Sequence, residues 1–364
     1  MTYNEALNLI LNKQSLGIKP GLERILKLLE EMGSPQDKIK IIHIAGTNGK
    51  GTVGATIADS LIDSGNKVGL FSSPWVDSYL EQIKINSNNI SQSDFAKYVT
   101  QYCDNDCTEF EMLTAIMYKY FADSNVDYAV VECGMGGKGD STNVEKKNIS
   151  VITSVSLDHT AFLGNTLEEI AKQKSGIIRK KCPCVLYPNP LCEEVFIGKT
   201  SQIIKIDEQG DFQKNNLAVA NAVLEILGAK KAEKATPLPA RCEIIGNIML
   251  DGAHNVDGAK ALATRLKSKN ITAVIGMMRD KDVEGYLRII APYCKRIITT
   301  APINERSMSA LELKSIADKF CNDVIATNTV EQAINTAHKY DDFSLVCGSF
   351  FLAREARNLL IKSL

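Results

Sequence analysis

Short apolar runs alternate with amphipathic stretches along most of the chain, and this alternation limits the fold more than any other feature. The runs "KIKIIHIA" (38–45) and "KVGLFSS" (67–73) predict buried strands, and "TVGATIADSLIDSG" (52–65) between them predicts a helix. The segment "TEFEMLTAIMYKYFADS" (108–124) places apolar side chains on one helical stripe. Strands separated by helices usually pair in parallel with helices on both faces, so we expect a mostly parallel α/β sheet.

The segment "HIAGTNGKGT" (43–52) joins the first of these strands to the helix that follows. Its glycines allow backbone N–H groups to converge on one point, and the helix N-terminus beyond them favours an anion. Lys50 can neutralise phosphate charge, and the Thr52 hydroxyl can meet Mg²⁺. The spacing departs from the common G-x-x-x-x-G-K-[ST] pattern, because Ile44 replaces the first glycine and Gly51 precedes Thr52. A glycine-rich turn with a surface lysine is the alternative, but the context favours a phosphate site.

Polar side chains follow three other strands of the predicted sheet. Ser73 ends one strand, Glu132 ends another before a glycine turn, and His159 lies just past a third. Each of them alone would be an ordinary turn, surface or core residue. Open α/β sheets bind ligands at the carboxyl ends of their strands, so the recurrence of polar residues there favours a site.

The segment "TLEEIAKQKSGIIRK" (166–180) is predicted to be helical. Thr166 is a candidate N-cap, and Glu169 would complete a capping box with it. Lys174 lies in this helix. Neither composition nor periodicity singles it out, and spacing alone favours a solvated lysine.

The alternation is interrupted by the charged segment 230–241 ("KKAEKATPLPAR"), which contains two prolines and is the best candidate linker. Strand and helix patterns resume after it. We therefore predict an ATP-binding domain over 1–235, with a P-loop-type, mostly parallel sheet covered by helices on both faces. We predict a smaller, Rossmann-like α/β domain over 236–364. The chain of 364 residues is long enough for two separate cores.

Composition argues against several classes of protein. The formal net charge of −1 suggests no general affinity for nucleic acid or an anionic membrane. No apolar run approaches the roughly 20 residues that span a bilayer. The N-terminus lacks the basic start and cleavage site of a signal peptide, so we expect a cytoplasmic protein. The ten cysteines include no pair of CxxC motifs, and we expect reduced, mostly buried thiols rather than disulfides or zinc ligands.

Six segments follow one another from about Gly21 to the C-terminal helix: "GTNGKGT", "FSSPW", "TEFEMLTA", "ECGMGGKGDSTN", "LDHTAFLGNTLEEIAKQKSGII" and "LDGAHN". They resemble the successive motifs of the folylpolyglutamate synthase and dihydrofolate synthase family, a branch of the ATP-dependent Mur ligases. The resemblance implies a ligase that adds L-glutamate to dihydropteroate, to reduced folates such as tetrahydrofolate, or to both, through an acyl phosphate. It also implies a monomer whose partners are these small molecules and ATP.

The resemblance further implies roles for single residues. The implied ATP-binding residues are Asn48, Gly49, Lys50, Gly51, Thr52, Asn216, Arg241 and Asp251. The implied ligands of Mg²⁺, with two ions expected, are Ser73, Glu132, His159 and Lys174. Lys174 matches a lysine that is carbamylated in the family, which would turn this cation into a carboxylate-like ligand. The implied catalytic residues are Lys50, Lys174 and His254, with His254 near the acyl phosphate and glutamate.

A third implied set would line the pterin or folate pocket: Gly21, Leu22, Thr108, Phe110, Gly139, Asp140 and Ser141. Both the substrate carboxylate and the triphosphate are anionic, so Lys50 and Mg²⁺ would be needed to screen their repulsion.

Three functions remain open from the sequence. The first is a bifunctional ligase that acts on dihydropteroate and then on reduced folates. The second is a folylpolyglutamate synthase alone. The third is a P-loop nucleotide-binding protein similar to a kinase, with no ligase step. The motif "LDGAHN" in the second domain would have no obvious use in a kinase and argues against the third.

Overall fold

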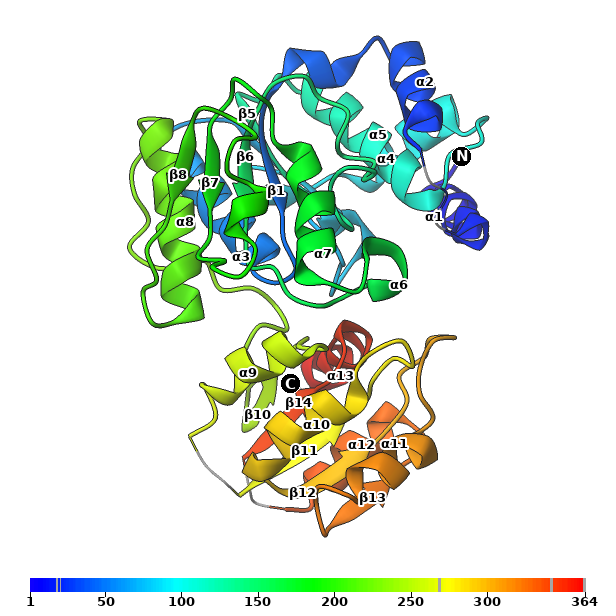
Figure 1. Cartoon of the computed structure of the whole chain (residues 1–364). Helices are drawn as coiled ribbons and strands as arrows, with labels where there is room; N and C mark the ends of the chain where they lie inside the picture. Colours follow the sequence, from blue (N-terminus) through cyan, green and yellow to red (C-terminus); the bar gives the residue numbers. More distant parts are fainter. Residues whose placement is uncertain (18, 20, 268–269, 341–342, 363–364) are drawn as a thin grey trace. The chain divides into compact units, whose positions relative to one another are not determined.

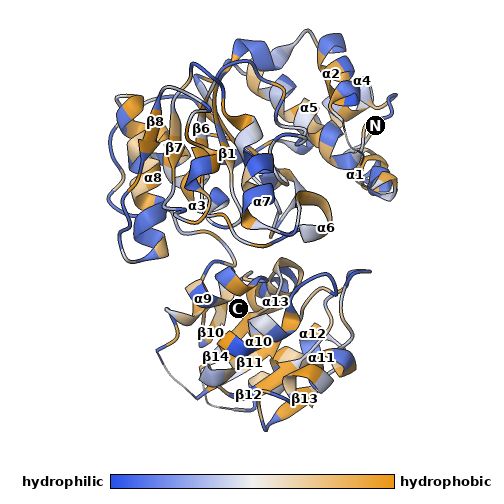
Figure 2. Ribbon diagram, in the orientation of Figure 1, coloured by the Kyte–Doolittle hydropathy of each residue, from blue (hydrophilic) through white to orange (hydrophobic). Residues whose placement is uncertain are grey.

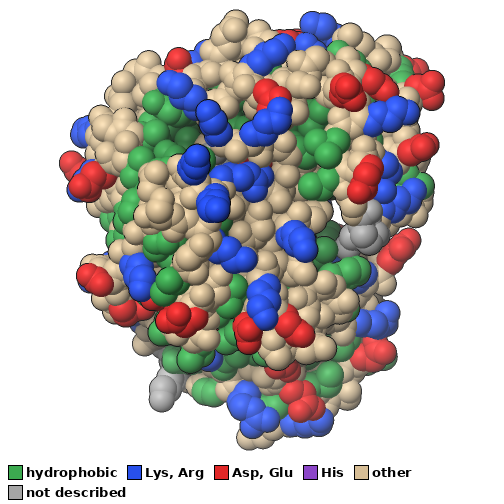
Figure 3. Space-filling view, turned by 45° about the horizontal axis from the view of Figure 1, so that its top comes forward, with side chains coloured by type: hydrophobic (Ala, Val, Ile, Leu, Met, Phe, Trp, Pro, Cys, Tyr) green, Lys and Arg blue, Asp and Glu red, His purple; other side chains and the backbone are tan. Residues whose placement is uncertain are grey.

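The computed structural model describes all residues except 18, 20, 268–269, 341–342 and 363–364. The chain divides into two compact units, Met1–Thr236 and Pro237–Leu364, each with its own sheet (Figure 1). Within the described residues, no helix has both the length and the apolar character needed to cross a membrane. All ten cysteines are free thiols, and half of them are buried. Acidic and basic side chains both occur over the face shown in Figure 3.

The described part of the first unit contains an eight-stranded sheet with the strand order β4-β3-β2-β5-β1-β6-β7-β8. The six strands from β2 to β8 in this order pair in parallel, and β3 and β4 add an antiparallel edge. The strands are β1 (Lys40–Ala45), β2 (Val68–Phe71), β3 (Ile83–Ile85), β4 (Asn88–Asn89), β5 (Tyr128–Glu132), β6 (Asn148–Ile152), β7 (Cys184–Leu186) and β8 (Ile203–Lys205).

Both faces of this sheet are covered by helices, which explains the continuous apolar runs in its strands. Ile41 and Ile42 are neighbours on β1 and point to opposite faces. Ile41 packs into a core that includes α1, α2, α4 and α5, and Ile42 into a core with α3 and α8. Figure 2 shows the central strands as largely hydrophobic. The helices are α1 (Tyr3–Asn12), α2 (Glu23–Glu31), α3 (Lys50–Asp63), α4 (Gln92–Tyr102), α5 (Glu109–Asp123), α6 (Thr160–Leu163), α7 (Leu167–Lys174) and α8 (Phe212–Ile226).

The second unit repeats this plan on a smaller scale. Its described residues form a six-stranded sheet, β13-β12-β11-β14-β10-β9, in which only β9 is antiparallel. The strands are β9 (Glu243–Ile245), β10 (Ile248–Leu250), β11 (Ile271–Ile275), β12 (Cys294–Thr299), β13 (Val324–Ala326) and β14 (Ser344–Cys347). The helices are α9 (Val256–Ala263), α10 (Val283–Ile290), α11 (Ala310–Ala317), α12 (Val330–Ala337) and α13 (Phe350–Lys362). The predicted fold class, two mostly parallel α/β sheets, is confirmed.

The helix predicted over 166–180 is shorter than its pattern indicates. Thr166 and Glu169 form the predicted capping box, but α7 ends at Lys174 and a short 3-10 turn, η4 (Ser175–Ile177), follows. The chain is held in this turn because Gly176 lies directly against another loop, where an added Cβ would be 2.4 Å from Lys138 Cα. Sequence periodicity carries no information about such a contact.

Candidate active site

The loop between β1 and α3 is shaped by close approach of other segments. Gly49 has a φ of 89°, and an added Cβ would lie 2.6 Å from Asn216 Oδ1 on α8. A Cβ on Gly46 would lie 1.7 Å from Thr153 Oγ1. Only glycine suits both positions. Helix α3 begins at Lys50, immediately after Gly49, so the loop ends at a helix N-terminus, which favours anions. Asn216 lies next to this point.

The strand register aligns the carboxyl ends of the strands that carry or precede Ser73, Glu132 and His159. Glu132 at the end of β5 pairs with Ile44 on β1, and Ala45 at the end of β1 pairs with Ile152 on β6. On the other side of β5, the last residue of β2 pairs with Val131. The carboxyl ends of β2, β5, β1 and β6 therefore stand side by side.

Lys50 and Glu132 meet at this edge. Lys50 Nζ lies 3.7 Å from Glu132 Oε1, and only 16% and 6% of their side-chain surfaces are exposed. Lys50 Nζ also donates a hydrogen bond of 3.3 Å to Thr47 O within the loop. The first residue of α3 thus places a cation next to a buried carboxylate, where low polarity strengthens electrostatic interactions.

Ser73 and His159 follow the two strands that neighbour β5 and β1, which are β2 and β6. Ser73 follows β2 and precedes a cis peptide bond to Pro74. His159 adopts a left-handed conformation (φ 50°), and its backbone N–H donates to Asp158 Oδ1 at 2.8 Å. Such a conformation costs about 1 kcal/mol or more outside glycine and occurs often at functional sites.

The donor atoms at these strand ends suit Mg²⁺ in part. Carboxylate and hydroxyl oxygens, as in Glu132 and Ser73, are its preferred protein ligands, and His159 adds an imidazole nitrogen. The described residues contain no group of three or more His, Cys, Asp and Glu side chains that could hold a metal. The predicted set contains only two residues of these types, Glu132 and His159, so a bound Mg²⁺ would take its other ligands from hydroxyls such as that of Ser73, from the substrate or from water.

Lys174 is buried, contrary to the solvated lysine that spacing favours. Only 2% of the residue is exposed, at the end of α7. Burial, together with the positive charge of Lys50, lowers the pKa of the amine to about 7, against the opposing effects of Cys133, Asp158 and Asp140. Within the described part of the chain, Lys174 Nζ has no hydrogen bond or ion pair. At neutral pH the Lys174 amine is therefore unprotonated far more often than that of an ordinary lysine.

Two segments of the predicted pterin pocket are joined by an ion pair that sequence reasoning did not identify. Gly21 and Leu22 lead into α2, where Arg24 Nη2 contacts Glu111 Oε1 at 2.9 Å. Glu111 also accepts the N–H of Thr108 at 2.7 Å, which closes the capping box of α5. The T-x-x-E spacing at 108–111 is a recognisable capping signal, but it gives no indication of the partner on α2.

The remaining residues of the predicted pocket lie on or against the loop after β5. The Phe110 ring packs on Gly134, where an added Cβ would lie 2.6 Å from Cζ. Asp140 is buried, with Oδ2 accepting the Met135 N–H at 2.7 Å and Oδ1 accepting from Thr142. Asp140 therefore shapes this loop. Gly139 and Ser141, on either side of Asp140, are exposed and partly exposed.

In the second unit, the predicted residues gather at the end of β10 and around Phe350. Asp251 is buried and accepts the N–H groups of Cys242 and Ala253, both at 2.8 Å. The Arg241 guanidinium lies 4.2 Å from the centre of the Phe350 ring, and the His254 ring lies 6.1 Å from it.

The tautomer of His254 follows from its backbone contact. His254 Nδ1 lies 2.9 Å from Gly252 O, and a carbonyl oxygen can only accept, so Nδ1 carries a proton. In the neutral ring, Nε2 is then the basic nitrogen. The involvement of Phe350 was not predicted, because an aromatic residue at a helix start has no distinguishing sequence signal.

Two family models match the chain. The Mur ligase middle domain matches residues 44–189, and the Mur ligase glutamate ligase domain matches 240–350. A probable dihydrofolate synthetase of Schizosaccharomyces pombe is 32% identical over 92% of this chain and 97% of its own length. A folylpolyglutamate synthase of Lacticaseibacillus casei is 30% identical over 99% of both chains. A bifunctional folylpolyglutamate synthase/dihydrofolate synthase from Yersinia pestis, solved with AMPPNP and Mn, has a TM-score of 0.88 at 26% identity, covering 99% and 98% of the two chains.

These matches agree with the order of motifs in the sequence and with the two α/β units. Both relatives align over nearly their whole length. The predicted resemblance is thereby confirmed. The chain belongs to the folylpolyglutamate synthase and dihydrofolate synthase family of the Mur ligases, which are ATP-dependent enzymes that form amide bonds.

Proposed function

We propose that this protein adds L-glutamate to dihydropteroate and to reduced folates, acting as both dihydrofolate synthase and folylpolyglutamate synthase. The observation that carries the proposal is the pairing of Lys50 with Glu132 at the mouth of the glycine loop, beside the buried amine of Lys174. Two anionic reactants can be joined where a cation and metal ligands converge. The bifunctional Yersinia pestis enzyme favours both activities over polyglutamylation alone.

The proposed reaction has two steps. An oxygen of the substrate carboxylate forms a bond to the γ-phosphorus of ATP as the bond to ADP breaks, which gives an acyl phosphate. The amine of glutamate then attacks the acyl carbon, and phosphate leaves with the electron pair of the C–O bond. The loop Asn48–Thr52 binds the triphosphate through backbone N–H groups and Lys50. Asn216 lies against this loop and is proposed to contact the adenine end of ATP.

We propose the metal ligands Ser73, Glu132, His159 and, after carbamylation, Lys174. Bound Mg²⁺ would neutralise charge on the transferring phosphoryl group and orient it. The chain's own part is to place the first three donors after neighbouring strands and Lys174 at the end of α7, and Lys50 adds a positive charge beside Glu132.

Carbamylation of Lys174 is proposed because the amine is buried and its pKa is near 7. Only a neutral amine can attack CO₂, and at neutral pH the unprotonated fraction is about a thousandfold larger than for an ordinary lysine. The nitrogen forms a bond to the CO₂ carbon and loses one proton. The resulting carbamate is an anion near the positive charge of Lys50, which lowers the cost of its burial.

In the second unit, Asp251 and Arg241 are proposed to contact ATP, and His254 to accept the proton of the attacking amine through Nε2. We also propose that residues 1–235 act as the ATP-binding domain and 236–364 as the glutamate-ligase domain. The proposed working form is a cytoplasmic monomer.

Product analysis by mass spectrometry tests the proposal. Purified protein is incubated with ATP, Mg²⁺ and L-glutamate, and with dihydropteroate or tetrahydrofolate. The bifunctional proposal predicts that both substrates gain glutamyl residues with release of ADP. Extension of tetrahydrofolate alone would restrict the function to polyglutamylation, and ADP release that is unaffected by glutamate would reject the ligase.

A further inference from the structure

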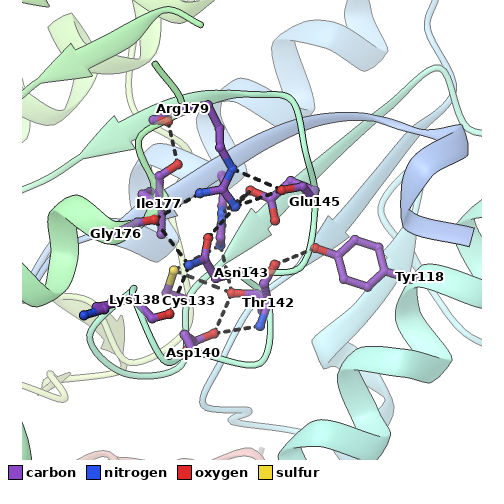
Figure 4. Close-up of polar contacts among 12 residues, drawn as sticks. Tyr118, Cys133, Lys138, Asp140, Thr142, Asn143, Glu145, Gly176, Ile177 and Arg179 are labelled. Carbon is purple, nitrogen blue, oxygen red and sulfur yellow. Dashed lines mark hydrogen bonds and ion pairs between the residues drawn. The ribbon is translucent and has the colours of Figure 1, made fainter. Parts of the chain in front are cut away.

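A polar network joins the loop after β5 to the segment after Lys174, and Arg179 donates hydrogen bonds to three of its residues (Figure 4). Arg179 follows η4, shortly after Lys174. Its Nη1 donates to Gly176 O at 3.0 Å, and its Nη2 donates to Asn143 Oδ1 at 2.6 Å. Both Nε and Nη2 donate to Glu145 O, at 3.1 and 2.8 Å. The guanidinium therefore joins the segment after Lys174 to the end of the loop that follows β5.

The same two segments are joined on both sides of Lys174. The Lys138 N–H donates to Gln173 O at 2.7 Å, immediately before Lys174. Asn143 Nδ2 donates to Lys138 O at 3.1 Å and to Gly176 O at 3.3 Å. Arg179 thus orients the Asn143 amide. Its guanidinium donates to the amide oxygen, so the amide nitrogen faces Lys138 O in the loop and Gly176 O in η4.

The backbone of the loop after β5 is in direct contact with the backbone around Lys174. A Cβ on Gly137 would lie 2.9 Å from Lys174 O and 3.1 Å from Lys174 Cα. A Cβ on Gly176 would lie 2.4 Å from Lys138 Cα. The backbone around Lys174 is therefore fixed by direct contact as well as by hydrogen bonds.

Glu145 anchors Arg179 to the interior of the sheet. Its Oε1 lies 3.3 Å from Arg179 Nη2 and 2.8 Å from Nδ1 of His43, a fully buried residue on β1. Burial alone would raise the pKa of Glu145, but His43 and Arg179 outweigh it and lower the pKa. The Glu145 carboxylate is therefore stabilised by two positively charged side chains, those of His43 and Arg179.

His43 is a donor at both ring nitrogens. The Thr142 hydroxyl donates its proton to Asp140 Oδ1 at 2.5 Å, so its oxygen can only accept from His43 Nε2, which lies 2.8 Å away. The same Nε2 lies 3.1 Å from Cys133 Sγ. Burial would lower the pKa of His43, but Cys133 and Glu145 raise it well above its ordinary value. The network thus runs from Arg179 to the carboxylate of Asp140.

We propose that Arg179 is a positioning residue for Lys174. By joining Gly176, Asn143 and Glu145, it fixes the end of α7 against the loop that carries Asp140, so that the Lys174 amine is presented in one position for carbamylation. Arg179 acts through Lys174 and has no direct contact with the reactants in this proposal. The inference rests on the proposed function, because it requires Lys174 to take part in the ligation.

The test compares wild-type protein with Arg179→Lys, which keeps the charge but loses the planar fork that reaches three acceptors. We expect kcat to fall about tenfold to hundredfold, with the KM for ATP and for folate changed less than about twofold. The second readout is the carbamate carbon signal of Lys174 in protein equilibrated with ¹³C-bicarbonate, measured by NMR. We expect its occupancy to fall in the variant.

Lys146→Met is the matched control. Lys146 is next to Glu145, but its side chain is 80% exposed and pairs only with Asp37, at 2.8 Å, in the described residues. We expect wild-type kcat and a wild-type carbamate signal. If Arg179→Lys does not fold, Arg179→Ala with added guanidinium chloride replaces it, because the Arg179 side chain is 21% exposed and a small cation can reach its place. Guanidinium should then restore part of kcat and of the carbamate signal.

The outcomes separate the two proposals. Wild-type protein that forms no glutamylated product would reject the proposed function. Active wild-type protein together with unchanged kcat and carbamate signal in the Arg179 variant would overturn the positioning role. A variant in which kcat falls while the carbamate signal stays at the wild-type level would overturn it too, as would an Arg179→Ala protein that guanidinium does not rescue.

Discussion

Replacing Lys174 with methionine should stabilise the folded protein while abolishing ligation. The side chain is 2% exposed, and the pKa of its amine is lowered from 10.5 to about 7. At about 1.4 kcal/mol for each pKa unit, holding the protonated amine in this buried position near Lys50 costs about 5 kcal/mol, of which about 4 kcal/mol remains at pH 7. Methionine has a similar length and no charge, so we expect a net gain of about 2–4 kcal/mol in the free energy of unfolding.

The sign of the pH dependence follows from the lowered pKa of Lys174. Between pH 7 and 10.5 the unfolded wild-type chain binds more protons than the folded one, so wild-type stability rises with pH in this window. The advantage of Lys174→Met should therefore be constant below pH 7 and shrink above it. Carbamylation also removes the buried ammonium, so bicarbonate should stabilise the wild-type protein but not the variant.

Urea unfolding in CO₂-free buffer from pH 6 to 9, with and without added bicarbonate, measures these effects. Lys172→Met serves as the control, because Lys172 lies on the same helix with a 60% exposed side chain and should change stability by less than about 0.5 kcal/mol. A Lys174→Met protein that is less stable than wild type, or whose difference from it does not vary with pH, would refute a buried amine with a lowered pKa. Retained ligase activity would refute the proposed metal-holding role.

Two further predictions concern the glycine loop and the buried ion pair. Gly49→Ala should raise the Kd for ATP at least about tenfold in calorimetry, because the new Cβ would meet Asn216 Oδ1 at 2.6 Å. Gly65→Ala is the control, because Gly65 has a similar φ of 86° but no atom within 4 Å of an added Cβ, so this variant should lose stability and keep the wild-type Kd. His43→Gln should lower the Tm by removing one of the two cationic partners of Glu145. The difference in Tm from wild type should be full below the unfolded histidine pKa of about 6.5 and should diminish as pH rises through the raised folded pKa of His43. Unchanged ATP affinity would contradict the first, and a Tm difference that grows at alkaline pH would contradict the second.

The features that could be predicted from the sequence are those set by local pattern. Apolar runs that alternate with amphipathic helical patterns predicted the two α/β units. The glycines around Lys50 predicted a loop at the start of a helix. Topology then determines which strand ends are neighbours, so Glu132 and the glycine loop could be expected at one edge.

The features that could not be predicted depend on long-range packing. Lys174 is buried and its backbone lies against Gly137, and neither residue has a sequence pattern that reveals the other. His43 lies in an apolar strand, while its partner Glu145 lies 102 positions away. Only the folded chain shows that the two meet, and the same holds for the contact of Arg179 with Asn143.

The transfer of labelled oxygen most directly tests the central claim that ATP activates a substrate carboxylate. Dihydropteroate with ¹⁸O in its carboxylate is incubated with the protein, ATP, Mg²⁺ and L-glutamate, and the released phosphate is analysed by mass spectrometry. An acyl phosphate requires one ¹⁸O atom in the phosphate for each amide formed, because the carboxylate oxygen that attacked phosphorus leaves with it. Released phosphate without ¹⁸O, while glutamylated product accumulates, would contradict the account.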